Sequence, residues 1–516
     1  MTLYALPNPA QSSAARASAL RASEQERLRR YAGYLDFYNG KQWAKTRPGR
    51  TSLVVNYTRA VVDKGVSYLL GQGINFAVPA GIEDAETRGL GDRGKRRENP
   101  ELRAQNPEPG QSSVLNPQPS YWAARAEALL YRVYEDNDLE AADAQGAING
   151  AVLGDTVFKV FWESGAWRQG SADRGWGVNA PSGTFAGDGG RIRVVNIDPF
   201  TFFPRWAADD PSALLSVDVV YQLPVEEAAR RYGDISISPN SHPLIDAVES
   251  WTNSEFALTV GDRDVVRSAN PYGFIPFVHI PNARPANEFW GVSDLKDVAP
   301  LNRELNERMS DVADVVRFHS DPPVIFKGVR EHGNLAVGPG TVWDLPEGAG
   351  VDLLEWRGQP PAVQEHIERV LRALHDVAET PKTAFGDSGR LLSGVALETE
   401  LQPLIQKTLR KRIWWSAGLR RRNRYILRIA ELNGMGSFAP YRSRIIWPPL
   451  LPADNEAEVR NNVALVQAGL RSRRTAMDHL GDESPETELR LIEEERRSAP
   501  TTTNWRRTFV DPIRPA

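Results

Sequence analysis

Cysteine is absent from the chain. Disulfide frameworks, thiolate zinc sites, iron–sulfur clusters and cysteine nucleophiles are therefore excluded. Histidine is scarce, with seven residues among 516. The histidines form no HExxH pattern and no paired set with carboxylates at metal-binding spacing. We therefore expect neither metal catalysis nor a bound cofactor.

Long apolar runs and an excess of positive charge are also missing. No stretch reaches the roughly 18 apolar residues of a membrane span, and the N-terminal residues lack the apolar core of a secretion signal. We therefore expect neither a membrane span nor a secretion signal. The 62 Lys and Arg residues against 66 Asp and Glu give a net charge of −4. This balance excludes a protein that coats nucleic acid through overall positive charge, so any DNA contact must come from local basic elements.

Two short motifs resemble catalytic loops but lack the context that the chemistry needs. Residues 89–96 contain the GxxxxGK core of a phosphate-binding loop, but Arg96 stands where Ser or Thr would bind magnesium, and no apolar strand precedes it. Residues 386–389 read GDSG, in which the second glycine follows Ser388 directly instead of two positions later, as a nucleophile elbow requires. We therefore expect no enzymatic activity.

The first half of the chain predicts an α+β region rich in antiparallel strands. Asn56 is a plausible N-cap for one of its helices. The polar, Pro/Gly/Asn-rich stretch 82–120 has almost no apolar periodicity and predicts a mobile insertion. The expected helices are 13–37, 56–71, 121–136 and 139–154, and the expected strands are 157–162, 191–197, 215–222, 256–260 and 275–280.

The second half predicts two helices that bracket a small β module, followed by a loop and a long basic helix. Pro403 should kink or start the long helix. In chain order, the expected elements are a helix at 293–319, β segments at 324–327, 341–345 and 351–356, a helix at 361–379, a loop at 380–394, a helix at 395–433, and charged helices at 455–470, 472–480 and 484–497.

Helix 293–319 carries an apolar seam and an acidic stripe beside it. The seam recurs in steps of four and three residues, the 3.5-residue repeat with which neighbouring helices pack side by side. Taken alone, these residues favour an amphipathic helix with a solvated acidic face. The alternative is a helix repeated around a ring, whose stripes form rings of charge. The seam comprises Val298, Asn302, Leu305, Met309, Val312, Val316 and His319, and the stripe comprises Glu304, Glu307, Asp311 and Asp314.

Helix 395–433 is basic, with aromatic residues at positions 414 and 415. Such a face could hold nucleic-acid phosphate. It could equally pair with acidic residues of a neighbouring subunit, which we slightly prefer because the whole chain is net acidic. The cations are Lys407, Arg410, Lys411, Arg412, Arg420, Arg421, Arg422, Arg424 and Arg428.

An ordered series of short segments between about Tyr31 and Leu432 resembles the portal proteins, or head–tail connectors, of tailed bacteriophages. No member of the series is specific alone, but their order is. The segments are YNGKQW (38–43), the helix 56–71 with VVD and SYLLG, AVLGD (151–155) leading into VFKVFW, IDPF (197–200), GFIPFV (273–278), WGVSDL (290–295) and SGVAL (393–397).

The resemblance implies a helix-rich α+β portal fold assembled as a ring. It divides the chain into an N-terminal arm (1–23), a wing (24–292, with the insertion 82–120 unassigned), a first stem helix (293–320), a clip (321–359), a second stem helix (360–379), a tunnel loop (380–394), a long kinked helix of the wing (395–433), a connection (434–454), a helical crown (455–497) and a C-terminal tail (498–516).

The implied function is a dodecameric ring at one vertex of the capsid, through which genome DNA is packaged and later ejected. The implied location is the virion, with assembly in the host cytoplasm. Implied partners are double-stranded DNA without sequence preference, the large terminase subunit, head-completion or adaptor proteins, and the major capsid or scaffolding protein. No membrane partner is expected.

The resemblance also gives roles to particular residues. The seam at Val298, Leu305, Met309, Val312 and Val316 would join subunits or stem helices. The acidic residues Glu304, Glu307, Asp311 and Asp314 would line the channel and repel phosphate. The DNA-contacting residues of the tunnel loop would be Lys382, Thr383, Ser388, Arg390 and Ser393.

Two other functional classes remain open at this point. A helical oligomeric scaffold, or a nucleic-acid-binding protein without DNA passage, would share the seam but not the tunnel loop. A nucleic-acid enzyme would need convergent acids or a metal-binding set, and the sequence offers neither.

Overall fold

The computed structural model divides the chain into two units, Met1–Pro448 and Pro449–Ala516, and each is described by itself. The described residues are 12–43, 49–71, 73–79, 121–164, 190–233, 243–320, 324–328, 347–353, 361–387, 394–451, 455–480, 488–489 and 492–493. The expected insertion at 82–120 and the expected strand at 341–345 lie outside these residues.

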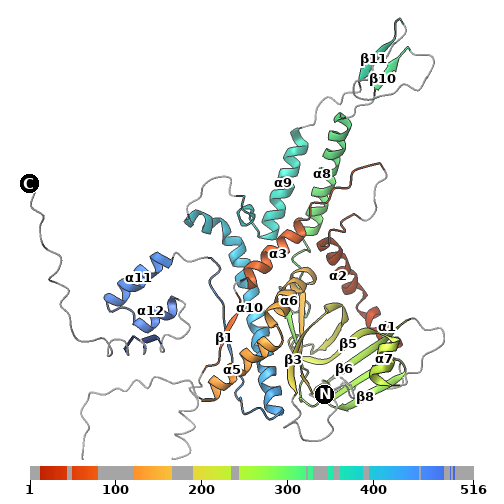
Figure 1. Cartoon of the computed structure of the whole chain (residues 1–516). Coiled ribbons are helices and arrows are strands. Elements are labelled where there is room, and N and C mark those ends of the chain that lie inside the picture. Colours follow the sequence, from red (N-terminus) through yellow and green to blue (C-terminus); the bar gives the residue numbers. More distant parts are fainter. Residues whose placement is uncertain are drawn as a thin grey trace, which may run out of the picture. The chain divides into compact units, whose positions relative to one another are not determined.

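Two antiparallel sheets form the centre of the first unit (Figure 1). Trp251 and Phe202 of the larger sheet both contact Phe277 of the smaller one, so the two sheets share one core. The smaller sheet has the order β3-β2-β9, with β2 at Asp155–Glu163, β3 at Arg191–Ile197 and β9 at Phe277–Pro281. The larger has the order β4-β5-β6-β7-β8, with β4 at Phe202–Trp206, β5 at Leu214–Pro224, β6 at Leu244–Trp251, β7 at Glu255–Val260 and β8 at Arg263–Ala269.

All five strands expected in this region are confirmed, while β4, β6 and β8 were missed. β6 contains Asp246 and Glu249, which hide its apolar alternation in the sequence. Glu249 is nevertheless buried, because its carboxylate pairs with Lys159 of β2 and accepts the indole N–H of Trp251. A buried ion pair between the sheets therefore replaces the apolar contact that a sequence pattern would reveal.

Helices α6 (Leu139–Leu153) and α10 (Gly394–Leu432) pack against the smaller sheet. Phe158 of β2 is fully buried between them, with the Trp415 ring centroid at 6.5 Å. A Cβ atom at Gly146 of α6 would come within about 3 Å of Phe158 and Thr156. The glycine thus lets α6 approach the sheet closely.

The single helix expected over 13–37 is two helices in the structure, α1 (Ser13–Ser23) and α2 (Gln25–Tyr38), with a break at Glu24. Ala17 of α1 packs with Val220 and Val248 of the larger sheet. Arg16 also forms a buried ion pair with Asp218. Residues 13–23, which we expected to belong to a separate N-terminal arm, are therefore packed onto the sheet.

The remaining elements of the first unit include two long helices that flank a hairpin. The predicted N-cap is confirmed, since the Asn56 side chain accepts the Arg59 N–H. The elements are α3 (Tyr57–Leu70), β1 (Asn75–Ala77) paired with β12 (Arg444–Ile446), α5 (Tyr121–Asp136), η2 (Pro199–Thr201), α7 (Val225–Tyr232), α8 (Val298–Ser320), the hairpin β10 (Val324–Lys327) and β11 (Gly350–Leu353), α9 (Pro361–Ala378) and η3 (Lys382–Phe385).

Helix α8 begins at Val298, five residues later than the sequence predicts. The preceding residues turn because they bond to the end of α6. The Asp294 N–H donates to the Ala151 carbonyl at 2.9 Å, and the Ser293 hydroxyl donates to the Val152 carbonyl. These bonds fix the base of α8 on α6 before the helix starts.

The second unit contains α11 (Asn455–Gln467) and α12 (Arg473–His479), which contact each other. Both confirm expected helices. Most of the helix expected at 484–497 lies outside the described residues.

On the inner face of α10, the face packed against the rest of the subunit, the cations bind within their own subunit. Neither nucleic-acid phosphate nor a neighbouring subunit is their partner there, so both interpretations of the basic helix are wrong for this face. Arg422 is fully buried and holds the Asp143 carboxylate through both of its terminal nitrogens, one of them at 2.8 Å. Burial opposes the charge, but Asp143 raises the pKa of Arg422. The helix is basic there because it passes the buried carboxylate of Asp143. The two paired residues lie 279 positions apart in the sequence.

We predict that Arg422→Met lowers the free energy of unfolding by about 3–5 kcal/mol, because it leaves a buried carboxylate unpaired. Arg422→Lys should be only slightly more stable than Arg422→Met, since an ammonium cannot reproduce the two-point contact with the carboxylate. Urea denaturation measures both effects, with Arg230→Met at an exposed position of α7 as the control. The double variant with Asp143→Leu should be more stable than Arg422→Met alone, and equal or lower stability would contradict the assignment.

Candidate functional site

Four polar side chains, spaced four residues apart along α8, each accept a backbone N–H from the segment 51–58. The segment runs antiparallel to the helix. Four helical residues rise about 6 Å, and two residues of extended chain span roughly the same distance, so the bonds from residues 51, 53 and 55 stay in register. The last step spans three residues because the chain enters α3 there. The bonds join Thr58 N to Asn302 Oδ1 (3.1 Å), Val55 N to Asn306 Oδ1 (2.9 Å), Leu53 N to Ser310 Oγ (2.9 Å) and Thr51 N to Asp314 Oδ1 (2.8 Å).

We call segment 51–58 the strap and these four bonds the ladder. The ladder is closed by Gln42, whose side-chain oxygen accepts N–H groups from both Asn302 and Asn306. Asn302 also donates to the Val55 carbonyl at 3.0 Å. Since both asparagines are almost fully buried, the ladder satisfies polar groups that water cannot reach.

The acidic stripe of α8 has partners inside the subunit. Arg308 binds Glu304 at 2.7 Å and Asp311 at 2.9 Å, and His366 of α9 lies 3.1 Å from Glu304. Hydrogen bonds from Arg308 and His366 lower the pKa of Glu304. Asp314 carries the last bond of the ladder, and hydrogen bonding to Thr51 lowers its pKa. Glu304 and Asp314 are thus kept ionised, while Arg308 reduces the net charge of the stripe.

The apolar seam of α8 changes character along the helix. Val298 and Leu305 are 1 % exposed, and Val298 packs with Val61 of α3 and Leu374 of α9. Met309 and Val312 are half-buried, while Val316 is 53 % exposed. The first part of the seam is therefore used within the subunit, and its last part is available to a neighbour.

The base of α8 is fixed to α10 by a buried charge cluster. The Asp294 carboxylate accepts bonds from Lys411 Nζ at 2.5 Å and Asn282 Nδ2 at 2.9 Å, and Lys407 Nζ lies 3.5 Å away. Burial opposes ionisation of Asp294, yet Lys407 and Lys411 hold its pKa well below the ordinary value. Burial lowers the pKa of Lys411. For these two lysines, as for Arg422, the partner is in the same chain.

The loop that follows α9 is held at its entry. Arg410 of α10 binds both carboxylate oxygens of Glu379, one at 2.7 Å. The Thr380 N–H donates to the His375 carbonyl, and Lys407 donates to the Ala378 carbonyl at 3.0 Å. These bonds hold the chain as far as Thr380, and beyond it the chain turns through the short helix η3.

Of the residues expected to contact DNA in this loop, Lys382 is exposed and Thr383 is half-buried, with a buried hydroxyl. Gly386 ends η3 with a φ of +89°, a conformation that glycine adopts without strain. Ser388, Arg390 and Ser393 lie outside the described residues. Sequence reasoning missed Glu379 and Arg410 as the anchor of the loop, because they lie 31 positions apart.

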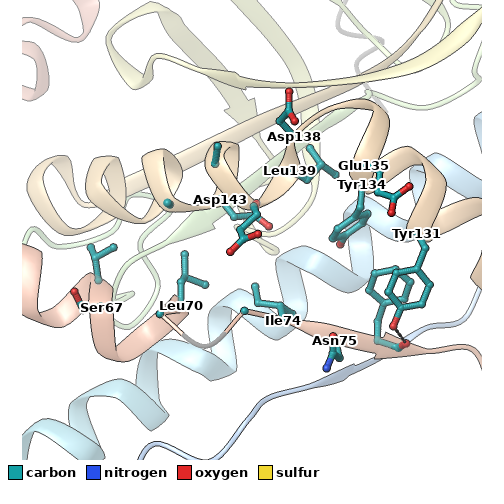
Figure 2. Close-up of a pocket in the computed structure, with 17 residues that line it drawn as sticks. Ser67, Leu70, Ile74, Asn75, Tyr131, Tyr134, Glu135, Asp138, Leu139 and Asp143 are labelled. Carbon is teal, nitrogen blue, oxygen red and sulfur yellow. Dashed lines mark hydrogen bonds between the residues drawn. The ribbon is translucent and has the colours of Figure 1, made fainter. Parts of the chain in front are cut away.

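A groove with a volume of about 870 Å³ lies between α3, β1, α5 and α6 (Figure 2). Leu70, Ile74 and Tyr131 contribute to its walls, and Glu135 and Asp138 lie at the turn between α5 and α6. Among the described residues, no three His, Asp or Glu side chains are grouped so that they could hold a metal ion. No described helix is long and apolar enough to cross a membrane.

We predict that Asp294→Asn lowers the free energy of unfolding at pH 7 by about 3 kcal/mol, because two lysines lose their buried counterion. The folded-state pKa of Asp294 is depressed, so its contribution is complete above the ordinary Asp pKa of about 3.9 and is lost as pH falls further. The difference from wild type should therefore stay constant between pH 7 and 5 and shrink below about pH 4. Urea denaturation at each pH tests this, with exposed Asp209→Asn as control; a difference independent of pH would contradict it.

A second prediction concerns the ladder. Asn306→Ala removes the acceptor of the Val55 N–H, at a cost of about 1–3 kcal/mol. Hydrogen exchange of a peptide covering 51–58 should accelerate. Exposed Asn461→Ala should leave the exchange of this peptide unchanged. Unaltered exchange in Asn306→Ala would show that the ladder does not hold the strap.

Comparison with protein families gives one match that covers nearly the whole chain. Residues 18–501 match the family described as phage portal protein, SPP1 Gp6-like. No curated protein matches the chain. The family match confirms the resemblance found in the short segments and agrees with the helix-rich α+β fold.

Portal proteins are structural, non-enzymatic proteins of the virion. They form the channel for DNA packaging and ejection at a capsid vertex, as oligomeric rings that interact with DNA and terminase. The order of elements described above, with α8, the hairpin and α9 between two parts of the β-rich body, is consistent with that role. The chain belongs to the SPP1 Gp6-like family of phage portal proteins.

Proposed function

We propose that twelve copies of the chain close into the portal ring, with α8 and α9 as the stem around the DNA. Figure 1 shows these two helices side by side, with hairpin β10–β11 between them in the chain. The hairpin then belongs to the clip (321–359), and the sheets with α10 belong to the wing. The observation that carries this division is the anchoring of α8, because the ladder and Asp294 fix the helix rigidly to the body.

The remaining parts follow the same order. Residues 293–320 and 360–379 form the stem, 380–394 the tunnel loop, 434–454 a connection, 455–497 the crown and 498–516 a tail. Helices α11 and α12 support the crown assignment, since they form a unit apart from the wing. Terminase, adaptor proteins and the capsid or scaffolding protein would bind outer parts of the ring.

In this proposal the acidic stripe of α8, comprising Glu304, Glu307, Asp311 and Asp314, faces the channel. Carboxylates repel DNA phosphate, so the duplex slides without adhering. Arg308 reduces this repulsion, but Glu304 and Asp311 both bind its guanidinium and compete with phosphate for it. Val316, exposed at the far part of the seam, would contact a neighbouring stem.

The tunnel loop would contact the DNA backbone through Lys382, Ser388, Arg390 and Ser393, whereas the buried hydroxyl of Thr383 is withdrawn from such a contact. Lys382 is exposed at the start of η3, immediately after the segment that Arg410 and Lys407 hold. A loop anchored at its entry can move beyond that point while its base stays in place. Contacts from short polar and basic side chains to phosphate carry no sequence information, which suits a channel that must pass any genome.

We predict that Lys382→Glu with Arg390→Glu leaves rings intact but lowers packaging on the order of tenfold, because two cations in each subunit become anions facing phosphate. Electron microscopy checks the rings, and a reconstituted motor assay measures packaged DNA. The double variant Lys296→Glu with Arg230→Glu, at two exposed positions, serves as a charge-matched control and should package normally.

Two outcomes would contradict parts of this assignment. Normal packaging by the loop variant would remove the loop from DNA contact. Loss of rings would show that the loop serves assembly instead of passage.

A further inference from the structure

One face of α10 is exposed and has no described partner of its own in the subunit. Leu409 and Ile413 are 43 % and 65 % exposed, although they are large apolar residues. Arg420 and Arg424 are also exposed and form no ion pair with a described residue. At about 100° per residue, the four positions fall within a narrow arc of the helix. We call them the α10 stripe, apolar at its first half and basic at its second.

The groove between α3, β1, α5 and α6 has the complementary character. Its walls include Val66, Leu70 and Ile74, and Tyr131 is 41 % exposed beside them. Figure 2 shows Glu135 and Asp138 along one side of the groove, at the turn between α5 and α6. Glu140 follows on the first turn of α6.

The rim of the groove is therefore acidic, and no described residue neutralises it. Glu135, Asp138 and Glu140 are exposed, and no ion pair to a described residue forms at any of them. Asp143, deeper in the groove, is different because Arg422 already neutralises it. An occupant with apolar side chains and nearby cations would match both the walls and the rim.

The α10 stripe and the groove face different directions, so they cannot contact each other within one subunit. Position 422 lies nine residues after 413, about 180° around the helix. Arg422 reaches Asp143, which lines the groove. The α10 stripe therefore points away from the groove of its own subunit, and only another molecule can bring the two together.

We infer that the α10 stripe of one subunit docks in the groove of the next. This inference rests on the proposed ring, in which each copy must present two different, complementary surfaces. A head-to-tail contact between unlike surfaces closes into a ring when the rotation between copies is suitable. Leu409 and Ile413 enter the apolar groove, while Arg420 and Arg424 face the acidic rim.

The test is a charge exchange across this contact. Arg420→Glu/Arg424→Glu should raise the protein concentration needed for half-assembly at least tenfold, as measured by mass in solution at low salt. Glu135→Lys/Asp138→Lys should do the same. Combining the two pairs in one chain should restore assembly, because each reversed cation again meets a reversed anion. The matched control is Arg29→Glu/Arg30→Glu on the exposed face of α2, which should assemble as wild type.

Each result decides a different part of the inference. Rings of unchanged mass and stability in both charge-reversed variants would overturn the contact while leaving the proposed ring intact. Weakened assembly that the combined variant does not restore would overturn the pairing of these two surfaces. A wild-type chain that stays monomeric at every salt concentration would instead overturn the proposed ring. Ile413→Asp gives an independent check, since it places a charge against the apolar walls and should weaken assembly without changing the thermal unfolding of the monomer.

Discussion

The buried cations on the inner face of α10 set the constraint on which the fold depends. A guanidinium or ammonium that leaves water needs a compensating partner, and a carboxylate is the partner of two such groups here. Asp143 on α6 receives Arg422, and Asp294 before α8 receives Lys411. One helix is thereby fixed both to the layer that covers the sheet and to the base of α8. The position of α8 relative to the two sheets follows from this arrangement.

Much of the fold could be predicted from local patterns. Strands such as β3 and β10 match the expected residues, and the Asn56 cap marks the start of α3. The charges of α10 were visible as well, but their partners were not, because ion pairing across hundreds of residues leaves no local signal. The break between α1 and α2 likewise depends on packing against a sheet that lies far along the chain.

The candidate site was predictable in outline only. Asn302 was placed in an apolar seam and Asp314 in an acidic stripe, since each fits the spacing of its neighbours. Together with Asn306 and Ser310 they form a different series with a period of four, and its purpose is evident only when the strap lies beside it. A helix surface can thus carry several overlapping patterns, of which the sequence shows the most hydrophobic first.

The two sides of the ladder, α8 and the strap, tolerate substitution to different degrees. Every acceptor on α8 is a side chain, whereas every donor in the strap is a backbone N–H, which most substitutions preserve. Side chains of Thr51 and Leu53 can therefore change without loss of a bond, and only proline removes the donor. The four α8 positions have no such freedom. Variation among natural or selected sequences should accordingly accumulate at strap positions such as 51 and 53 and avoid the helix face that holds them.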